Sequence, residues 1–282
     1  MSVKIIVDSS TDVTPDIKER LTVVPLIIRF GDKEYMDGID IDHNQFYEKL
    51  VECDELPSTS QPSPDAFMKV YEELTARGDT CVVITLSSKL SGTYQSASLA
   101  AADYEGKVFV VDSKSVAIGT GILTEVALSL ADMGFAAKDI AKVLEEEREN
   151  LRIIAMLDTL EYLKKGGRIS ATTAIAGGLL SIKPVVEISD GAVEIIGKAR
   201  GSKQGNNLLV KEIENSGGVD FSKPILLGYT GLSDALLKKY IEDSAYLWEN
   251  GVDKLRYTIV GGVIGTHTGP GVVAAAYFKN KA

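Results

Sequence analysis

Residues 81–112 read CVVITLSSKLSGTYQSASLAAADYEGKVFVVD, and the fold class can be inferred outward from this stretch. Cys81–Leu86 and Lys107–Val111 are short apolar runs rich in β-branched residues, a composition typical of buried strands. Ser91–Asp103, between them, has the pattern of a helix. Strands that alternate with helices in this way form a parallel sheet with helices over both faces.

The same alternation continues on both sides of this stretch. Further strand patterns are Val3–Val7, Val23–Phe30 and Arg152–Leu157, and further helical patterns are Pro64–Arg77, Val116–Met133 and Ala137–Asn150. We therefore predict a parallel α/β domain over residues 1–151. Ligands of such sheets usually bind at the carboxyl ends of the strands. The polar loops that follow three of the strands should gather at one edge: residues 8–12, 87–88 and 112–113.

The pattern changes after about residue 150. Lys183–Ile188 and Val193–Ile196 flank the turn Ser189-Asp190-Gly191, and an Asp-Gly pair suits the tight turn of a β-hairpin. The remaining patterns are two helices and three strands: Gln204–Asn215, Ile225–Tyr229, Asp234–Asn250, Leu255–Ile264 and Val272–Phe278. A hairpin in a sheet that also receives helical crossovers implies a mixed sheet. We predict a second, mixed-sheet α/β domain over residues 152–282, with a ligand between the two domains.

Composition and charge narrow the class of protein. Of the 282 residues, 45% are hydrophobic and 25% are charged, as in soluble globular proteins. The net charge of −10 argues against general binding to nucleic acid, which needs a basic surface. No apolar run reaches 18 residues and the N-terminus runs directly into a strand pattern. We therefore expect no membrane span, no signal peptide and a cytoplasmic protein. Cys53 and Cys81 lack metal-ligand spacing and are expected to be reduced thiols.

Three polar loops are candidates for a ligand site. Residues 261–271 read GGVIGTHTGPG after an apolar run and carry His267, one of only two histidines. Residues 59–63, TSQPS, and residues 87–93, SSKLSGT, supply further uncharged donors. A helix that begins near Ser91 also directs free N–H groups outward, which favours an anion. Together the three loops suit a small anion held by hydroxyls, amides and one imidazole.

Each of these residues also has a plainer structural interpretation. Ser91 alone is more often a helix cap than a ligand contact, Thr59 an ordinary turn residue, and His267 a hydrogen-bonded structural histidine. Asp8 and Asp12, after the first strand, suit either Mg²⁺-dependent phosphoryl chemistry or the cap of the next helix. The chain has no Gly-x-x-x-x-Gly-Lys phosphate loop and no Gly-x-Ser-x-Gly motif. We therefore do not expect it to be an enzyme by itself.

Two basic islands without an acidic residue occur in this acidic chain. Their cations are Lys164, Lys165, Arg168 and Lys183 within residues 163–186, and Lys198, Arg200, Lys203 and Lys211 within residues 195–211. These islands suit a docking surface for an acidic partner or a phosphate, or an ordinary solvated face. Residues 174–180, AIAGGLL, are apolar and small. They suit either a core helix or the wall of an apolar cavity.

Five motifs, in order along nearly the whole chain, resemble those of the DegV family. They are DSSTD at 8–12, TSQPS at 59–63, LSGTYQSA at 90–97, LDTLEYLKKGGRI at 157–169 and IGTHTGPG at 264–271. The family includes the fatty-acid-binding subunits of bacterial fatty acid kinase. The resemblance implies one long-chain fatty acid buried between two domains, no other cofactor, and a separate kinase subunit that phosphorylates the bound acid with ATP. The acyl phosphate would enter phospholipid synthesis, and this role is compatible with transient contact with a membrane.

The resemblance also implies roles for residues. The fatty acid carboxylate is expected to be bound by Thr59, Ser91 and His267, with Thr93 and Thr268 close by. We expect the apolar tail to lie along Ala174, Ala176, Gly178, Leu179, Val263 and Ile264, and the kinase to dock on Arg168, Arg200 and Lys203. Two alternative functions remain. One is a lipid-sensing regulator without a kinase, and the other is a phosphoryl transferase or hydrolase that uses Asp8, Asp12 and His267.

Overall fold

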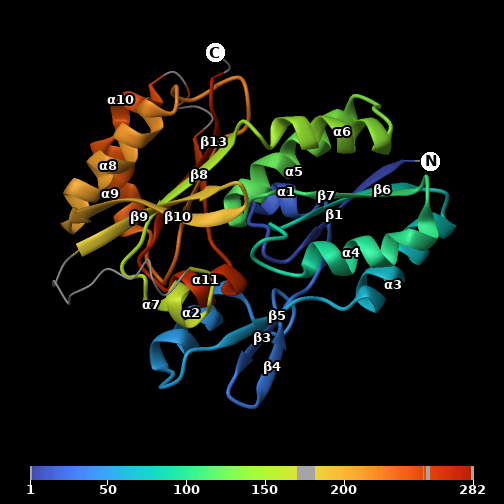
Figure 1. The fold of residues 1–282 in the computed structure, drawn as a ribbon, viewed down its shortest axis with the longest axis horizontal. Helices are drawn as coiled ribbons and strands as arrows, with labels where there is room; N and C mark the ends of the chain where they lie inside the picture. The colour runs from blue at the N-terminus through green and yellow to red at the C-terminus, as the bar shows by residue number, and fades with distance from the viewer. Residues whose placement is uncertain (1, 170–181, 250, 252–254, 281–282) are drawn as a thin grey trace.

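The computed structural model describes residues 2–169, 182–249, 251 and 255–280, and two large sheets with their helices form most of it (Figure 1). The first sheet has the strand order β2-β1-β6-β7, and its neighbouring strands are all parallel. Its strands are β1 (Val3–Asp8), β2 (Thr22–Val24), β6 (Thr80–Thr85) and β7 (Val108–Asp112). The predicted parallel N-terminal sheet is confirmed.

Helices cover both faces of this sheet because successive residues of a strand point to opposite sides. Ile5 and Val7 of β1 pack with α5 (Ala117–Asp132) and α6 (Ala137–Glu147). Ile6, between them, packs with α3 (Pro64–Ala76) and α4 (Thr93–Ala101) on the other face. The short helix α1 (Pro15–Lys18) and a 3₁₀ turn (Ala102–Tyr104) complete this half of the chain.

The second sheet is mixed, with the order β10-β9-β8-β13-β11-β12. Its strands are β8 (Leu151–Met156), β9 (Ile182–Ser189), β10 (Ala192–Arg200), β11 (Leu226–Tyr229), β12 (Arg256–Ile259) and β13 (Val273–Phe278). One face carries α8 (Gly201–Asn215), α9 (Ala235–Asp243) and α10 (Ala245–Trp248). The other face packs against α5, which thus lies between the two large sheets (Figure 1). The predicted mixed C-terminal sheet is confirmed.

A third, small unit was not expected from the sequence. The strands β3 (Ile27–Phe30), β4 (Lys33–Met36) and β5 (Ser58–Ser60) form an antiparallel sheet. This sheet packs with α2 (His43–Glu52) and α11 (Gly262–Thr268) around one apolar cluster, and α7 (Glu161–Lys165) lies beside α11 (Figure 1). Segments from opposite ends of the chain meet here. The proposed domain boundary at residues 151/152 stays a prediction.

Three predicted elements were wrong in part. Val23–Phe30 is divided between β2 and β3, which belong to different sheets, because Pro25 has no N–H to donate to a strand ladder. Asp234–Asn250 is broken between α9 and α10 at Ser244, whose hydroxyl donates back to the Tyr240 carbonyl. Leu255–Ile264 is a strand only as far as Ile259, and its last residues belong to α11.

The glycine-rich stretch near the C-terminus was predicted as a loop, whereas most of it is the helix α11. Glycine is a poor helix former, so local propensity gives no helix signal here. The helix forms because its glycines let it approach α2 and β3 closely. A Cβ on Gly262 would lie 2.6 Å from the Ile28 side chain, and a Cβ on Gly265 would lie 2.6 Å from the Tyr47 hydroxyl.

Candidate functional site

A cavity of about 370 Å³ lies between the two large sheets and the small unit. Its walls come from the loop after β6, the start of α5, the strands β8, β9, β10 and β13, and α11. The volume is within the usual range of ligand sites, roughly 300–1,000 Å³. The cavity therefore lies where elements from both halves of the chain meet.

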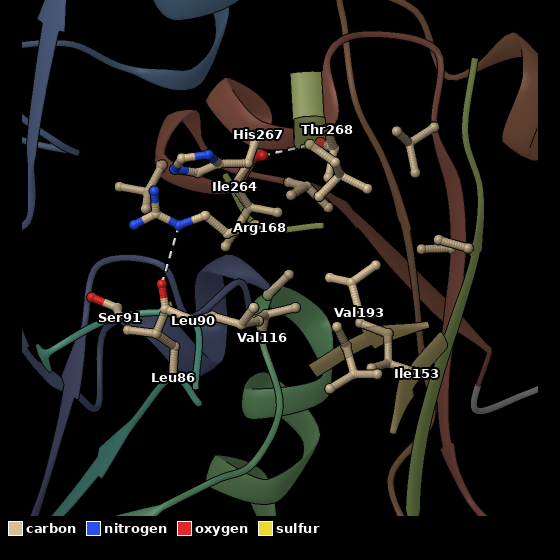
Figure 2. Close-up of a pocket in the computed structure, with 18 of the residues that line it drawn as sticks. Leu86, Leu90, Ser91, Val116, Ile153, Arg168, Val193, Ile264, His267 and Thr268 are labelled. Atoms are coloured by element: carbon tan, nitrogen blue, oxygen red, sulfur yellow. Dashed lines mark hydrogen bonds between the residues drawn. The ribbon is translucent and has the colours of Figure 1, made fainter. Parts of the chain in front are cut away.

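The two ends of the cavity differ in chemistry. Figure 2 shows Ser91, Arg168 and His267 near one another on one side and Ile153 and Val193 on the far side. We call the first side the polar end, and it comprises Thr59, Ser91, Arg168, His267 and Thr268. The walls beyond it are mostly aliphatic, with Val116, Ile153, Leu157, Val186 and Val193 among them.

Thr59 and His267 contact each other directly across the polar end. The strand β5 carries Thr59 and the last turn of α11 carries His267, and Thr59 Oγ1 lies 2.8 Å from His267 Nε2. Burial, and to a smaller extent the positive charge of Arg168, lower the pKa of His267 to about 4. The imidazole is therefore neutral at pH 7 and carries a single N–H.

The second ring nitrogen of His267 has capacity for a ligand. His267 Nδ1 is buried and has no hydrogen-bond partner within the described residues. The ring fits here because residue 166 is a glycine, since a Cβ on Gly166 would collide with Nδ1. When Nε2 accepts from the Thr59 hydroxyl, Nδ1 carries the N–H and remains free to donate. A buried polar atom without a partner is costly, so a ligand acceptor would stabilise this ring.

Ser91 lies where α4 begins. Its Oγ is 2.9 Å from Thr93 Oγ1 and accepts from the Thr93 backbone N–H at 3.3 Å. Ser91 lines the cavity, whereas Thr93 is fully buried behind it and is not part of the wall. The N-cap of α4 is Gly92, so the interpretation of Ser91 as the helix cap was wrong by one position, whereas its place in the cavity wall agrees with a ligand contact.

The α11 helix supplies more of the wall. Thr268 lines the cavity, and its hydroxyl donates to the Ile264 carbonyl at 3.0 Å. Val263 and Ile264, which the sequence placed along the tail, also line the cavity, but from a helix rather than from the end of a strand. The other four residues proposed for the tail, Ala174, Ala176, Gly178 and Leu179, lie outside the described residues.

The cations proposed for a docking surface lie in two different places. Arg168 belongs to the polar end, where its Nε donates to the Leu90 carbonyl at 3.2 Å and its Nη1 donates to the Gly166 carbonyl at 2.6 Å. Arg200 and Lys203 are exposed, at the junction of β10 and α8. Arg168 thus borders the cavity, whereas Arg200 and Lys203 face solvent.

Asp8 and Asp12 hold backbone segments. Asp8 accepts from the Ser10 hydroxyl and from the Leu86 N–H, at 2.5 and 2.8 Å, and Asp12 accepts from the Gly261 N–H at 2.8 Å. Within the described ranges, no group of three or more His, Cys, Asp or Glu side chains could hold a metal ion. None of the helices in these ranges is both long and apolar enough to cross a bilayer.

The sequence identified Val263 and Ile264 but not the aliphatic wall formed by the strands of the second sheet. The signal was present in β8, where Ile153, Ala155 and Leu157 line the cavity while Ile154 and Met156 belong to the core on the opposite face. An apolar residue at every position predicts a strand buried on both sides. It does not reveal that one of those sides faces a cavity.

The fold and the site define a class of protein: a two-sheet α/β protein with a ligand-sized cavity that is polar at one end and aliphatic beyond. The chain belongs to the DegV family, since the family model described as "Uncharacterised protein, DegV family" matches residues 2–280. A DegV domain-containing protein of Caldanaerobacter subterraneus subsp. tengcongensis is 34% identical over 284 residues, which cover 99% of each chain.

Solved structures of similar chains share the fold. A fatty-acid-binding DegV family protein of Thermus thermophilus is 31% identical, with a TM-score of 0.88 over 99% of this chain and 100% of that one. DegV of Bacillus subtilis, described as a fatty acid binding protein, is 29% identical, with a TM-score of 0.82 over 99% and 100% of the two chains. A stearic-acid-binding protein of Eubacterium ventriosum is 26% identical, with a TM-score of 0.83 over 99% of each chain.

Proposed function

We propose that the protein binds one long-chain fatty acid in this cavity, with the carboxylate at the polar end and the tail along the aliphatic walls. The observation that carries the proposal is the division of the cavity into a polar end and an apolar remainder. Three solved relatives named for fatty acid binding support it. Ser91 and His267 would donate to the carboxylate, Thr59 would orient the His267 ring, and Thr268 would lie beside them with Thr93 holding the Ser91 hydroxyl.

The energetics suit a fatty acid. A tail of about 16–18 carbons contributes roughly 12 kcal/mol of gross transfer free energy, at about 0.8 kcal/mol per buried CH₂ group. The head group therefore needs only enough hydrogen bonds to offset the desolvation of its charge. The Ser91 hydroxyl and the neutral imidazole of His267 can provide them without a bidentate salt bridge. A carboxylate held in this way keeps more of its nucleophilicity.

The finer part of the proposal is a role as a fatty-acid-presenting subunit. A separate kinase would phosphorylate the bound carboxylate with ATP, and the acyl phosphate would serve phospholipid synthesis in the cytoplasm. Arg200 and Lys203 are exposed cations in a stretch without acids, so they suit an acidic face of that kinase. Arg168, at the edge of the polar end, would lie between the docking surface and the carboxylate. No cofactor other than the fatty acid is proposed.

The hydrolase alternative fits the geometry less well. Asp12 contacts the first turn of α11 through Gly261, whereas His267 lies in its last turn. At 1.5 Å per residue, six residues of helix separate them by roughly 9 Å along the axis. A base and its orienting carboxylate need direct hydrogen-bond contact, which this arrangement does not provide.

Native mass spectrometry of the purified protein tests fatty acid binding. The expected result is one long-chain fatty acid per chain, which stays bound under gentle ionisation and is released on denaturation. The delipidated protein should take up one equivalent of hexadecanoic acid. A protein that carries no lipid and takes up none after delipidation would contradict the proposal.

A further inference from the structure

The helix α11 joins the polar end of the cavity to a second set of buried groups. Its last turn carries His267, and its first turn is held by residues from the N-terminal part of the chain. Asp12 lies in the loop after β1, and its Oδ1 accepts the Gly261 N–H at 2.8 Å although the two residues are 249 positions apart. Gly261 is buried, so this N–H depends on Asp12 for an acceptor.

Asp12 also holds a second wall of the cavity. Its backbone N–H donates to the Ala117 carbonyl at 3.3 Å, where α5 begins. Ala117 lines the cavity and has a φ of 50°, a left-handed conformation that is strained for a residue with a Cβ. Asp12 is 3% exposed and therefore fixed by its surroundings. One buried residue thus contacts the starts of both α11 and α5.

A second contact holds the same corner of the chain. The Tyr47 hydroxyl, on α2, donates to the Val260 carbonyl at 2.8 Å, one residue before Gly261. The Tyr47 ring is fully buried against α11, where only glycine at position 265 leaves it room. The turn between β12 and α11 is therefore fixed from the loop after β1 and from α2. Neither contact comes from the sheet to which β12 belongs.

We infer that Asp12 is a positioning residue for the carboxylate site: by accepting the Gly261 N–H it fixes the start of α11 and so places His267 against Thr59. Tyr47 supports the same placement through the Val260 carbonyl. The inference rests on the proposed function for its link to fatty acid binding. It concerns a hydrogen-bond acceptor and not a proton donor, because Asp12 contacts neither the polar end nor any group of the ligand.

The surroundings of Asp12 agree with an acceptor role. Burial raises its pKa well above the ordinary value, the Gly261 N–H opposes this rise, and Asp37, Lys18 and Asp8 act at longer range. The imidazole of His43 and the hydroxyl of Tyr47 also face this region. Burial therefore disfavours the charge on Asp12, while the acceptor oxygen remains necessary. An asparagine, which has the same shape and keeps one acceptor oxygen, should replace it.

The experiment compares Asp12→Ala with Asp12→Asn by two readouts. In Asp12→Ala the dissociation constant for hexadecanoic acid should rise about tenfold or more, whereas in Asp12→Asn it should stay within about threefold of the parent. The NMR titration of His267 in the ligand-free protein should move from a pKa of about 4 toward the ordinary 6.5 in Asp12→Ala only. His267→Asn assigns the signal, since the chain has only two histidines.

A destabilising control separates positioning from general loss of structure. Ser244→Ala removes the acceptor of the buried Trp248 indole N–H on the far face of the second sheet. It should lower the unfolding temperature and leave the His267 titration unchanged. The inference is overturned if folded Asp12→Ala keeps the parent affinity and titration, or if Asp12→Asn loses affinity as Asp12→Ala does. If Asp12→Ala does not fold, Tyr47→Phe decides by the same two readouts.

The His267 titration also distinguishes this inference from the proposed function, because it is measured without a ligand. If the protein bound no fatty acid, the proposed function would be contradicted, but the titration would still report whether Asp12 places His267. A shifted titration without any fatty acid binding would keep the positioning role and remove its link to lipid. If Asp12→Ala weakened fatty acid binding but left the His267 titration unchanged, the inference would be overturned. Asp12 would then act on the cavity wall formed by α5 and not on His267.

Discussion

At the scale of single residues, the polar end combines uncharged hydrogen-bonding side chains with one cation, Arg168. Ser91 and His267 would each give one hydrogen bond to a carboxylate, and the Thr59 hydroxyl, which donates to His267 Nε2, fixes the tautomer in which His267 Nδ1 carries the N–H. Thr59→Ala, Ser91→Ala and His267→Ala should each weaken fatty acid binding by about 1–3 kcal/mol, the usual effect of losing a hydrogen bond to a charged group. Calorimetric titration measures this. Exposed Ser129→Ala is the control, and unchanged affinity in all three variants would remove the carboxylate assignment.

The buried imidazole predicts a pH dependence of stability. The pKa of His267 is about 4 in the folded protein and about 6.5 when it is unfolded, so between these values the unfolded chain binds the extra proton. Protonation then favours unfolding, and stability falls as the pH falls through this window, by at most about 1.4 kcal/mol per pH unit. Urea titrations at pH 7 and pH 5 should show a smaller loss for His267→Gln than for the parent. Equal losses would mean that the ring is accessible to solvent.

The residue types of the site could be predicted from sequence, but their contacts could not. Hydroxyls and a histidine between glycines indicate an anion site, and the family resemblance implied which of them take part. The bond between Thr59 and His267 joins positions 208 residues apart and depends on the packing of α11. The position of the Arg168 side chain also could not be predicted from the sequence, because two preceding glycines allow a side chain to turn inward as well as outward.

At the scale of elements, two strands divide their side chains between the cavity and a packed core. Ala155 of β8 and Ala274 of β13 line the cavity, whereas Ala275 lies in the core on the opposite face. Ala155→Leu should keep the protein folded because the cavity has room for the added atoms. The same change should lower the affinity for long-chain acids about tenfold, since it occupies the space of the tail.

Ala275→Leu is the matched control for this change. Its side chain would enter a close-packed core, where extra atoms typically cost about 1–3 kcal/mol of stability. It should therefore lower the unfolding temperature and leave the relative affinity for long and short acids unchanged. Thermal unfolding and binding of hexadecanoic and decanoic acids distinguish the two variants. If Ala155→Leu bound both acids as the parent does, this wall would not contact the tail.

The alternation of strands and helices was predictable because buried positions recur in the sequence with a spacing that differs between strands and helices. The exceptions have physical reasons. The stretch that contains β2 and β3 is mostly apolar, and only Pro25 indicates that the chain changes sheets there. The helix α11 could not be predicted from the sequence because its glycines lower helix propensity. Contacts with Phe46 and Tyr47 stabilise the helix in spite of this low propensity. Those contacts come from residues more than 200 positions away.

At the scale of the whole molecule, the cavity is shared between both large sheets and the small unit. A ligand bound there should stabilise all three together, by about 2.7 kcal/mol at a free ligand concentration one hundred times its dissociation constant. Hydrogen exchange should slow in β6, β8 and α11 on loading with hexadecanoic acid. Hexanoic acid at the same concentration is the control and should have little effect. Protection confined to one sheet would contradict a site between them.

The exposed basic surface predicts partner-dependent behaviour. Arg200→Ala and Lys203→Ala should keep fatty acid binding and weaken association with the proposed kinase, more so as salt rises, because charged docking is screened. Lys142→Ala, an exposed cation on α6, is the control. Acyl phosphate formation and lipid binding are measured side by side with the purified kinase. Full activity of both variants would remove the docking role.

The central claim is that a fatty acid carboxylate lies against His267 while its tail points toward Ile153 and Val193. The most direct test is an NMR contact experiment on protein with ¹⁵N-labelled histidine, loaded with hexadecanoic acid that carries ¹³C only in the carboxyl group. We predict a contact between the labelled carbon and the His267 imidazole, and its loss when the label is moved to the terminal methyl. A terminal methyl carbon that contacts the His267 imidazole, or a loaded protein whose carboxyl carbon gives no contact to His267, would contradict the account.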